Sequence, residues 1–165
     1  MWRKYFGTGA TIIGVDRDPF VRSVPNAELI IGDQTDNALW DRIFDQYGEI
    51  DCFIDDGSHV NEHQIATFVK VWPNIRYGGV YICEDTHTSY WEGEWNGGYP
   101  KNDSFTSTMK ALADAVNMEH IKNFTFPDSY VNLVKDIGFV GFYNSQVVIT
   151  KTKTPFTRVF GGPKT

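Results

Sequence analysis

Short apolar runs of strand length alternate with stretches of helical periodicity along most of the chain. This alternation predicts parallel strands joined by crossover helices, which is an α/β fold. We expect a Rossmann-like, mostly parallel sheet with helices on both faces and a C-terminal antiparallel hairpin. The strands are predicted at residues 11–16, 27–33, 50–55 and 80–85, the helices at 36–47, 65–72 and 104–118, and the hairpin at 137–152.

Individual residues mark several of the boundaries. Asp36 is a good N-cap for the first of these helices, and Pro73 should end the second. Gly78 and Gly79 predict a turn before the fourth strand. Residues 86–103 show neither helical nor strand periodicity, and they are longer than an ordinary connecting loop. We therefore expect a lid or substrate loop there.

The length and charge of the chain narrow its class. Its 165 residues suit one domain, which we place at residues 1–153, with an irregular tail over 154–165. A net charge of −6 with scattered basic residues argues against a nucleic-acid backbone as the main partner.

Cysteine usage and the absence of long apolar segments indicate the compartment. Cys52 and Cys83 each lie in an apolar run, which favours reduced core thiols over a disulfide. No apolar segment approaches the ~20 residues needed to span a bilayer, and the first ten residues lack the apolar centre of a signal peptide. These features predict a soluble cytoplasmic protein with no membrane partner.

Acidic residues end four consecutive predicted strands. In an open parallel sheet the carboxyl ends of the strands lie along one edge, and ligands bind in the crevice outside that edge. Each acid alone could instead serve a turn or a helix N-cap, and this reading stays open for Asp33 and Asp36. Together they predict a site, and they are Asp16, Asp33, the pair Asp55 and Asp56, and the pair Glu84 and Asp85.

Three of these carboxylates, from Asp56, Glu84 and Asp85, are expected to meet. Clustered carboxylates repel one another unless a cation joins them, and oxygen ligands without cysteines favour Mg²⁺, with Mn²⁺ or Ca²⁺ as substitutes. His59 follows closely and suits a general base, because histidine as a residue type exchanges protons near neutral pH. His63 and His87 could each be a ligand or a bystander.

The motifs "GVD", "GD", "IDDGSH" and "VYICEDTHTSYW", with the closing hairpin, resemble the class I S-adenosylmethionine-dependent methyltransferases. More narrowly, "DDGSH" followed by "EDTHTSYW" is similar to the metal-dependent sugar O-methyltransferases of macrolide biosynthesis, of the mycinamicin and tylosin type, and to relatives known as cephalosporin hydroxylases. The resemblance runs from residue 1 to about residue 152. It implies methyl transfer from S-adenosylmethionine to a hydroxyl of a sugar or macrolide-type substrate, with Mg²⁺ bound.

The resemblance also implies roles for single residues. It assigns Mg²⁺ to Asp56, Glu84 and Asp85, and the role of base to His59. By the same resemblance, Asp16 would bind the ribose hydroxyls of the cofactor, and Asp33 and Gln34 would lie near its adenine. Asp55 is the fourth residue expected near the cofactor, where it could orient the loop. In the segment after the acid pair, the aromatic side chains would form a wall against the sugar, and they are Trp91, Trp95 and Tyr99. The alternative is that these side chains only fill a hydrophobic space.

The sequence departs from the class I pattern at its start, where the first strand and the Gly-rich turn of that family have no counterpart. The first strand is normally central, so we expect a homo-oligomer and weak affinity for S-adenosylmethionine. A non-catalytic binding or oligomerisation module is the alternative reading. A metal-dependent hydrolase is a third, but no nucleophile motif supports it.

Overall fold

The computed structural model describes residues 2–22, 25–117, 120–121 and 128–153. The predicted tail over 154–165 lies outside these residues. The chain divides into two compact units, Met1–Gly48 and Glu49–Thr165, called here the first and second units. None of the described helices has the length and apolar character needed to cross a membrane.

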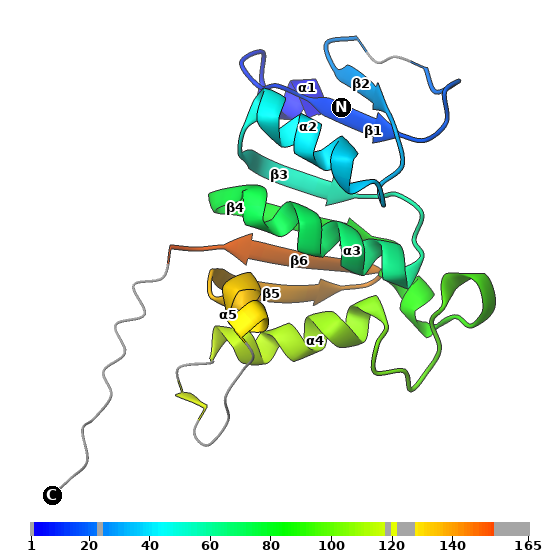
Figure 1. Cartoon of the computed structure of the whole chain (residues 1–165), viewed down its shortest axis with the longest axis vertical. Coiled ribbons are helices and arrows are strands. Elements are labelled where there is room, and N and C mark those ends of the chain that lie inside the picture. The colour runs from blue at the N-terminus through cyan, green and yellow to red at the C-terminus, as the bar shows by residue number, and fades with distance from the viewer. Residues whose placement is uncertain (1, 23–24, 118–119, 122–127, 154–165) are drawn as a thin grey trace, which may run out of the picture. The chain divides into compact units, whose positions relative to one another are not determined.

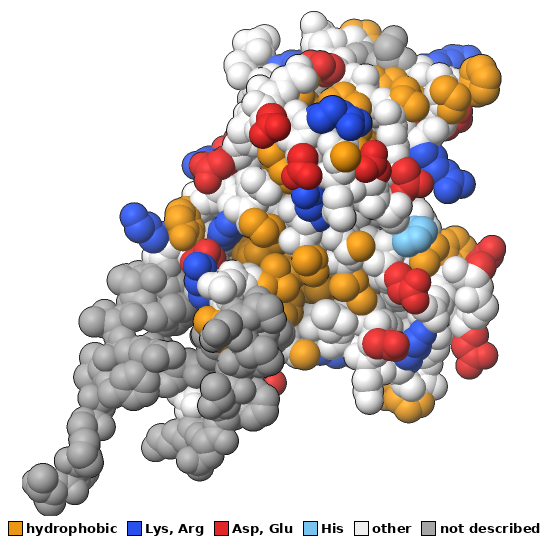
Figure 2. Space-filling view, viewed as in Figure 1, with side chains coloured by type: hydrophobic (Ala, Val, Ile, Leu, Met, Phe, Trp, Pro, Cys, Tyr) orange, Lys and Arg blue, Asp and Glu red, His pale blue; other side chains and the backbone are white. Residues whose placement is uncertain are grey.

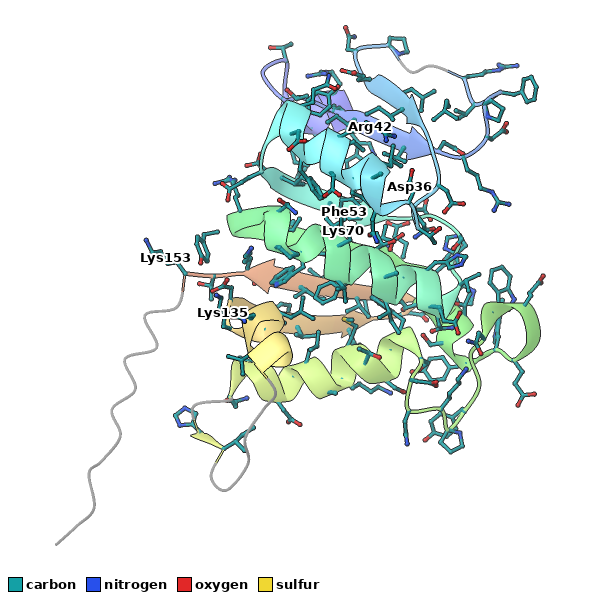
Figure 3. The ribbon with its side chains drawn as sticks, in the orientation of Figure 1. Asp36, Arg42, Phe53, Lys70, Lys135 and Lys153 are labelled. Carbon is teal, nitrogen blue, oxygen red and sulfur yellow. The ribbon has the colours of Figure 1, made fainter. Side chains whose placement is uncertain are left out.

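The first unit contains a parallel pair of strands and two helices (Figure 1). Strand β1 (Ile13–Asp16) pairs with β2 (Glu28–Ile31), in the two places that the sequence predicted. Helix α1 (Trp2–Phe6) precedes them and α2 (Asn37–Tyr47) follows. Asp36, labelled in Figure 3, is the N-cap of α2, as predicted, because its side chain accepts a hydrogen bond of 2.9 Å from the backbone N–H of Ala38.

The second unit is built on a four-stranded sheet in the order β3-β4-β6-β5. Strand β3 (Ile50–Asp55) runs parallel to β4 (Ile75–Glu84). The hairpin of β5 (Ile137–Tyr143) and β6 (Gln146–Lys151) is antiparallel and joins the sheet through β6 and β4, which confirms the predicted hairpin. The predicted α/β class with parallel strands and a C-terminal antiparallel pair is therefore confirmed.

Helices α3 (Asn61–Val71) and α4 (Phe105–Val116) pack on each other and on this sheet, and a short helix, α5 (Asp128–Val134), packs on α4. Residues alternate in burial along β4 and β6, so one face of the sheet carries the core. Phe68 of α3 meets the ring of Tyr81 edge-on, with 5.2 Å between centroids. The largest buried side chains of the core include Trp72, Phe105, Met109 and Ile149.

The structure corrects one predicted boundary. The predicted turn at Gly78 and Gly79 is wrong, because β4 begins at Ile75 and continues through both glycines, with an irregularity in its register against β3. Gly78 has a φ of 85°, and a Cβ on Gly79 would lie 2.9 Å from the carbonyl oxygen of Asp51, so glycine is required within the strand. The short helix α5 had no predicted element.

The strands also form two sheets rather than one. In the described part of the chain, β1 pairs with β2, β3 pairs with β4, and no strand pairing joins the two sheets. In the view of Figure 2 the Lys and Arg side chains are scattered among acidic ones, in line with the sequence.

Candidate active site

Two acids and a histidine of the second unit converge at the carboxyl ends of β3 and β4. Asp56 directly follows β3, and Asp85 directly follows β4. The parallel register pairs Asp55 with Cys83, so the two strand ends are level. His59 lies between β3 and α3. One ligand atom from each of Asp56, His59 and Asp85 lies within 4.8 Å of the other two, which is a spacing that a cation could bridge.

The carboxylate of Asp85 lies between two histidines. Its Oδ2 is 3.6 Å from Nε2 of His59, and its Oδ1 is 3.8 Å from Nδ1 of His87. The hydroxyl of Ser145, in the turn between β5 and β6, donates to the same Oδ1 at 3.4 Å and lies 2.5 Å from Nδ1 of His87. Asp85 is therefore fixed on one side and open to His59 and Asp56 on the other.

The backbone at this site adopts an uncommon conformation. His59 and Asp85 have φ angles of 58° and 50°, in the left-handed region that residues other than glycine seldom occupy. Such conformations persist where the surrounding structure holds them, and they gather at functional sites.

Glu84, the third predicted metal ligand, makes a different contact. Its Oε1 accepts a hydrogen bond of 3.2 Å from Nε2 of Gln146. Among the described residues, the group that could hold a cation has His59 where the prediction had Glu84. The structure thus brings together two of the three predicted carboxylates and the predicted base.

Asp55 is buried, with 4% of its surface exposed, and its Oδ2 accepts a hydrogen bond of 2.8 Å from the hydroxyl of Tyr81 on β4. Burial, followed by the charge of Asp55, raises the pKa of Tyr81 well above its usual value. Burial, followed by the same charge, also raises the pKa of the Cys83 thiol well above its usual value. This setting suits a residue that holds the loop after β3, one of the roles expected for Asp55.

Aromatic side chains flank the histidines. The segment after Asp85 forms two short helical turns, η2 (Thr86–Tyr90) and η3 (Gly93–Trp95). Trp91 lies edge-on to His87, with 4.5 Å between ring centroids, and Trp95 lies 6.5 Å from His59 and 6.2 Å from Trp91. Tyr99, which is 80% exposed, contacts Tyr90 instead. The two tryptophans are therefore the predicted aromatic residues that adjoin the site.

The strand-end acids of the first unit shape local turns. Oδ1 of Asp16 accepts from the backbone N–H of Asp18 at 2.9 Å. Oδ1 of Asp33 accepts from the backbone N–H and the hydroxyl of Thr35, at 2.8 and 2.7 Å. The backbone carbonyl of Gln34 accepts from Nε1 of Trp40 at 2.8 Å. The turn reading of Asp33 thus describes its contacts, and its cofactor role stays a prediction.

Sequence reasoning missed three residues that support the site, namely Asn61, Thr88 and Ser145. Each acts on the site through residues 27 to 60 positions away in the chain, as the hydrogen bonds from Asn61 to Thr88 and from Ser145 to Asp85 illustrate. Only a known fold could have predicted such pairs. His63 is hydrogen-bonded to the Ser58 hydroxyl at 2.8 Å and lies outside the group of three.

No family model matches the chain. Mycinamicin VI 2''-O-methyltransferase of Micromonospora griseorubida is 38% identical over 124 residues, which are 73% of this chain and 31% of that protein. A tetracenomycin rhamnosyl 2'-O-methyltransferase of Streptomyces olivaceus is 37% identical over 120 residues, 71% of this chain and 31% of that protein. The chain thus spans about a third of the length of the curated relatives it matches.

A solved structure of the MycE methyltransferase from the mycinamycin pathway, in complex with Mg, SAH and mycinamycin VI, matches with a TM-score of 0.80 and 29% identity. The match covers 92% of this chain and 38% of that one. The fold is therefore that of the class I S-adenosylmethionine-dependent methyltransferases, as the motifs predicted. Within that class, the chain is a homologue of the O-methyltransferases named for mycinamicin and tetracenomycin.

Proposed function

We propose that this chain carries the metal site and the base of an Mg²⁺-dependent, S-adenosylmethionine-dependent O-methyltransferase that acts on a sugar hydroxyl. The convergence of Asp56, His59 and Asp85 at adjoining strand ends carries the proposal. Its support from relatives is that they are O-methyltransferases and that the MycE structure contains Mg and SAH.

The residues at the site fit a hard divalent cation. Two carboxylates supply oxygen ligands, which Mg²⁺ prefers, and no cysteine belongs to the group of three that could hold the ion. We propose Asp56 and Asp85 as ligands from their geometry, and Glu84 as the third from the resemblance alone. A cation held there would supply Lewis acidity to the acceptor hydroxyl.

His59 has the position of a base. Its Nε2 lies 3.6 Å from Asp85, so a proton received on the imidazole would be stabilised by that carboxylate. In the reaction, the acceptor oxygen forms a bond to the methyl carbon while the bond from carbon to sulfur breaks. The electron pair of that bond stays on sulfur, and the hydroxyl proton passes to His59. Orientation of the two reactants supplies much of the rate.

The remaining contacts are assigned by resemblance. We propose that Asp16 takes the cofactor ribose and that Asp33 and Gln34 lie near the adenine, with Asp55 orienting the loop that carries Asp56. Trp91 and Trp95 adjoin the two histidines, and their rings suit the apolar face of a sugar or macrolide. Tyr99 would extend this surface. The mycinamycin VI in the MycE structure supports a substrate of that kind.

The test is metal-dependent stabilisation. A ligand at one hundred times its Kd stabilises the folded state by about 2.7 kcal/mol, so millimolar Mg²⁺ or Mn²⁺ should raise the melting temperature of the parent chain. Asp85→Asn should remove this response. Asp103→Asn is the matched control, because Asp103 is exposed and pairs only with Lys101 among the contacts described for it. A parent without a metal response would exclude the metal site.

A second candidate function is a binding or oligomerisation module. It is favoured by the strand order, in which β3 is the end strand of the four-stranded sheet of described residues. Strands at the end of a sheet can recruit strands from other chains. Light scattering decides whether the chain self-associates, and calorimetric titration with S-adenosylmethionine, with and without Mg²⁺, separates the two functions, because a module that only assembles binds no cofactor.

A further inference from the structure

One hydroxyl connects the two residues of the site that have left-handed backbones. Oγ1 of Thr88 lies 2.8 Å from the carbonyl oxygen of His59 and 3.1 Å from that of Asp85. A threonine hydroxyl has a single proton, so the two carbonyls share one donor. Thr88 is 2% exposed, which keeps water from replacing it. The hydroxyl therefore ties the loop after β3 to the chain after β4 at the point where each conformation is least favoured.

Asn61 fixes Thr88 in turn. Its Nδ2 donates to the carbonyl oxygens of Thr88 at 3.3 Å and Trp95 at 2.8 Å. Its Oδ1 accepts from the hydroxyl of Ser89 at 2.8 Å and from the backbone N–H of Phe105 at 2.7 Å. A side-chain amide offers two donors and two acceptor positions, and all four are used here. With 1% exposure, Asn61 is a rigid anchor at the start of α3.

We propose that Thr88 is a positioning residue that sets the separation of His59 and Asp85 through their backbones. This inference rests on the proposed function, in which Asp85 binds the cation and His59 takes the proton. The Thr88 hydroxyl contacts the backbone carbonyl oxygens of His59 and Asp85. Both of these residues have left-handed backbones, and their side chains lie 3.6 Å apart at the site. Loss of the hydroxyl should therefore spread the ligand atoms without removing any of them.

The experiment compares Mn²⁺ affinity, measured by calorimetry, in three variants of the full chain. Thr88→Val keeps the shape but loses the hydroxyl, and it should weaken Mn²⁺ binding by about 10-fold to 100-fold, the usual range for residues that orient metal ligands. Thr88→Ser keeps the hydroxyl and should stay within about threefold of the parent. Thr106→Val is the matched control, because its buried hydroxyl belongs to the same network but contacts Thr86 and Ser89 instead.

A merely structural Thr88 gives a different pattern. If Thr88→Val melts at a lower temperature but binds Mn²⁺ with parental affinity, or if Thr106→Val weakens binding as much, the proposal is overturned. Should Thr88→Val not fold, Thr88→Ala removes the same hydroxyl without new bulk and is judged by the same criterion.

Failure of the proposed function would be recognised separately, as a parent chain that does not bind Mn²⁺. The crystal structures of the parent and of the hydroxyl-free variant then decide. The proposal stands if residues 59 and 85 leave the left-handed region in the variant and their side chains separate. It is overturned if both φ angles stay positive with the side chains still in contact.

Discussion

The acids of the first unit and those of the second are positioned in different ways. Asp16 and Asp33 each accept hydrogen bonds from residues two positions ahead in the chain. Asp85, in contrast, meets His59 across 26 positions and Ser145 across 60. The first arrangement needs only a local turn, whereas the second needs the packed sheet and helices around it.

This difference indicates where chemistry can be supported. A turn fixes its own backbone but leaves its side chain committed to that turn. The packed strand ends hold two carboxylates and an imidazole together against electrostatic repulsion and unfavourable backbone angles. We therefore expect substitutions at the strand ends of the second unit to change metal binding strongly, and those in the first unit's turns to leave metal binding unchanged.

The largest effect is expected for His59→Ala. Loss of a general base lowers turnover by about 10² to 10⁴, and because two carboxylates remain, Mn²⁺ binding should persist. The test is methyl transfer to a sugar acceptor. If the chain itself is inactive, the same variant is measured in a longer form that adds a strand and a Gly-rich turn upstream. His63→Ala is the matched control. Parental turnover in His59→Ala would take His59 out of the mechanism.

Alkaline pH should destabilise the second unit next most strongly. The pKa values of Cys83 and Tyr81 are raised by burial in the folded state, so the unfolded chain loses these protons first. Stability is then full below the ordinary thiol pKa and falls as pH rises above about 8.5 for the thiol and about 10 for the phenol, by up to about 1.4 kcal/mol per pH unit for each group.

Urea unfolding from pH 7 to pH 10.5 measures this slope. Cys83→Ala should be less stable at neutral pH because of the cavity, but its slope between pH 9 and pH 10 should be flatter than that of the parent. Equal slopes in the two proteins would contradict the assignment to Cys83.

A smaller effect is expected at the start of α2. Asp36→Ala removes the N-cap acceptor for Ala38 and should cost about 1 kcal/mol in free energy of unfolding. Asp36→Asn retains an acceptor and should cost less. Urea unfolding of both variants checks the order, and an equal loss for Asn and Ala would show that the charge of Asp36, which both variants lack, contributes more than its capping hydrogen bond.

The smallest effect is expected for Asp33→Ala, which removes a local turn contact and should change stability by about 0.5 kcal/mol. Its metal response should equal that of the parent, since the proposed ligands belong to the second unit. If affinity for S-adenosylmethionine falls more than tenfold while stability is unchanged, the predicted cofactor role of Asp33 is supported over the turn reading.

Much of the fold could be predicted because it follows from local periodicity. The strand at 50–55, the helix capped by Asp36 and the closing hairpin all agree with the structure. The path of β4 through Gly78 and Gly79 could not be predicted, because a Gly-Gly dipeptide occurs both in turns and in strand irregularities. The close approach of the Asp51 backbone, which the sequence does not show, decides between the two.

The site was predictable in part for a related reason. Parallel strands end at one edge, so Asp56, His59 and Asp85 could be placed together from their positions after two strands. The supporting residues Thr88 and Ser145 could not be predicted, because their hydroxyls reach their partners through turns whose geometry no motif encodes. Glu84 illustrates the remaining difficulty, because adjacency in sequence does not say which neighbour a side chain will contact.

The left-handed backbone of residue 85 restricts which amino acids that position can accept. Asn, Asp and His are enriched in this conformation, and longer or branched side chains are not. Glutamate would keep the negative charge but lose the conformational tolerance, and asparagine would keep the tolerance but lose the charge. Aspartate alone meets both demands, so a change of one methylene at this position should be as damaging to metal binding as the loss of the charge itself.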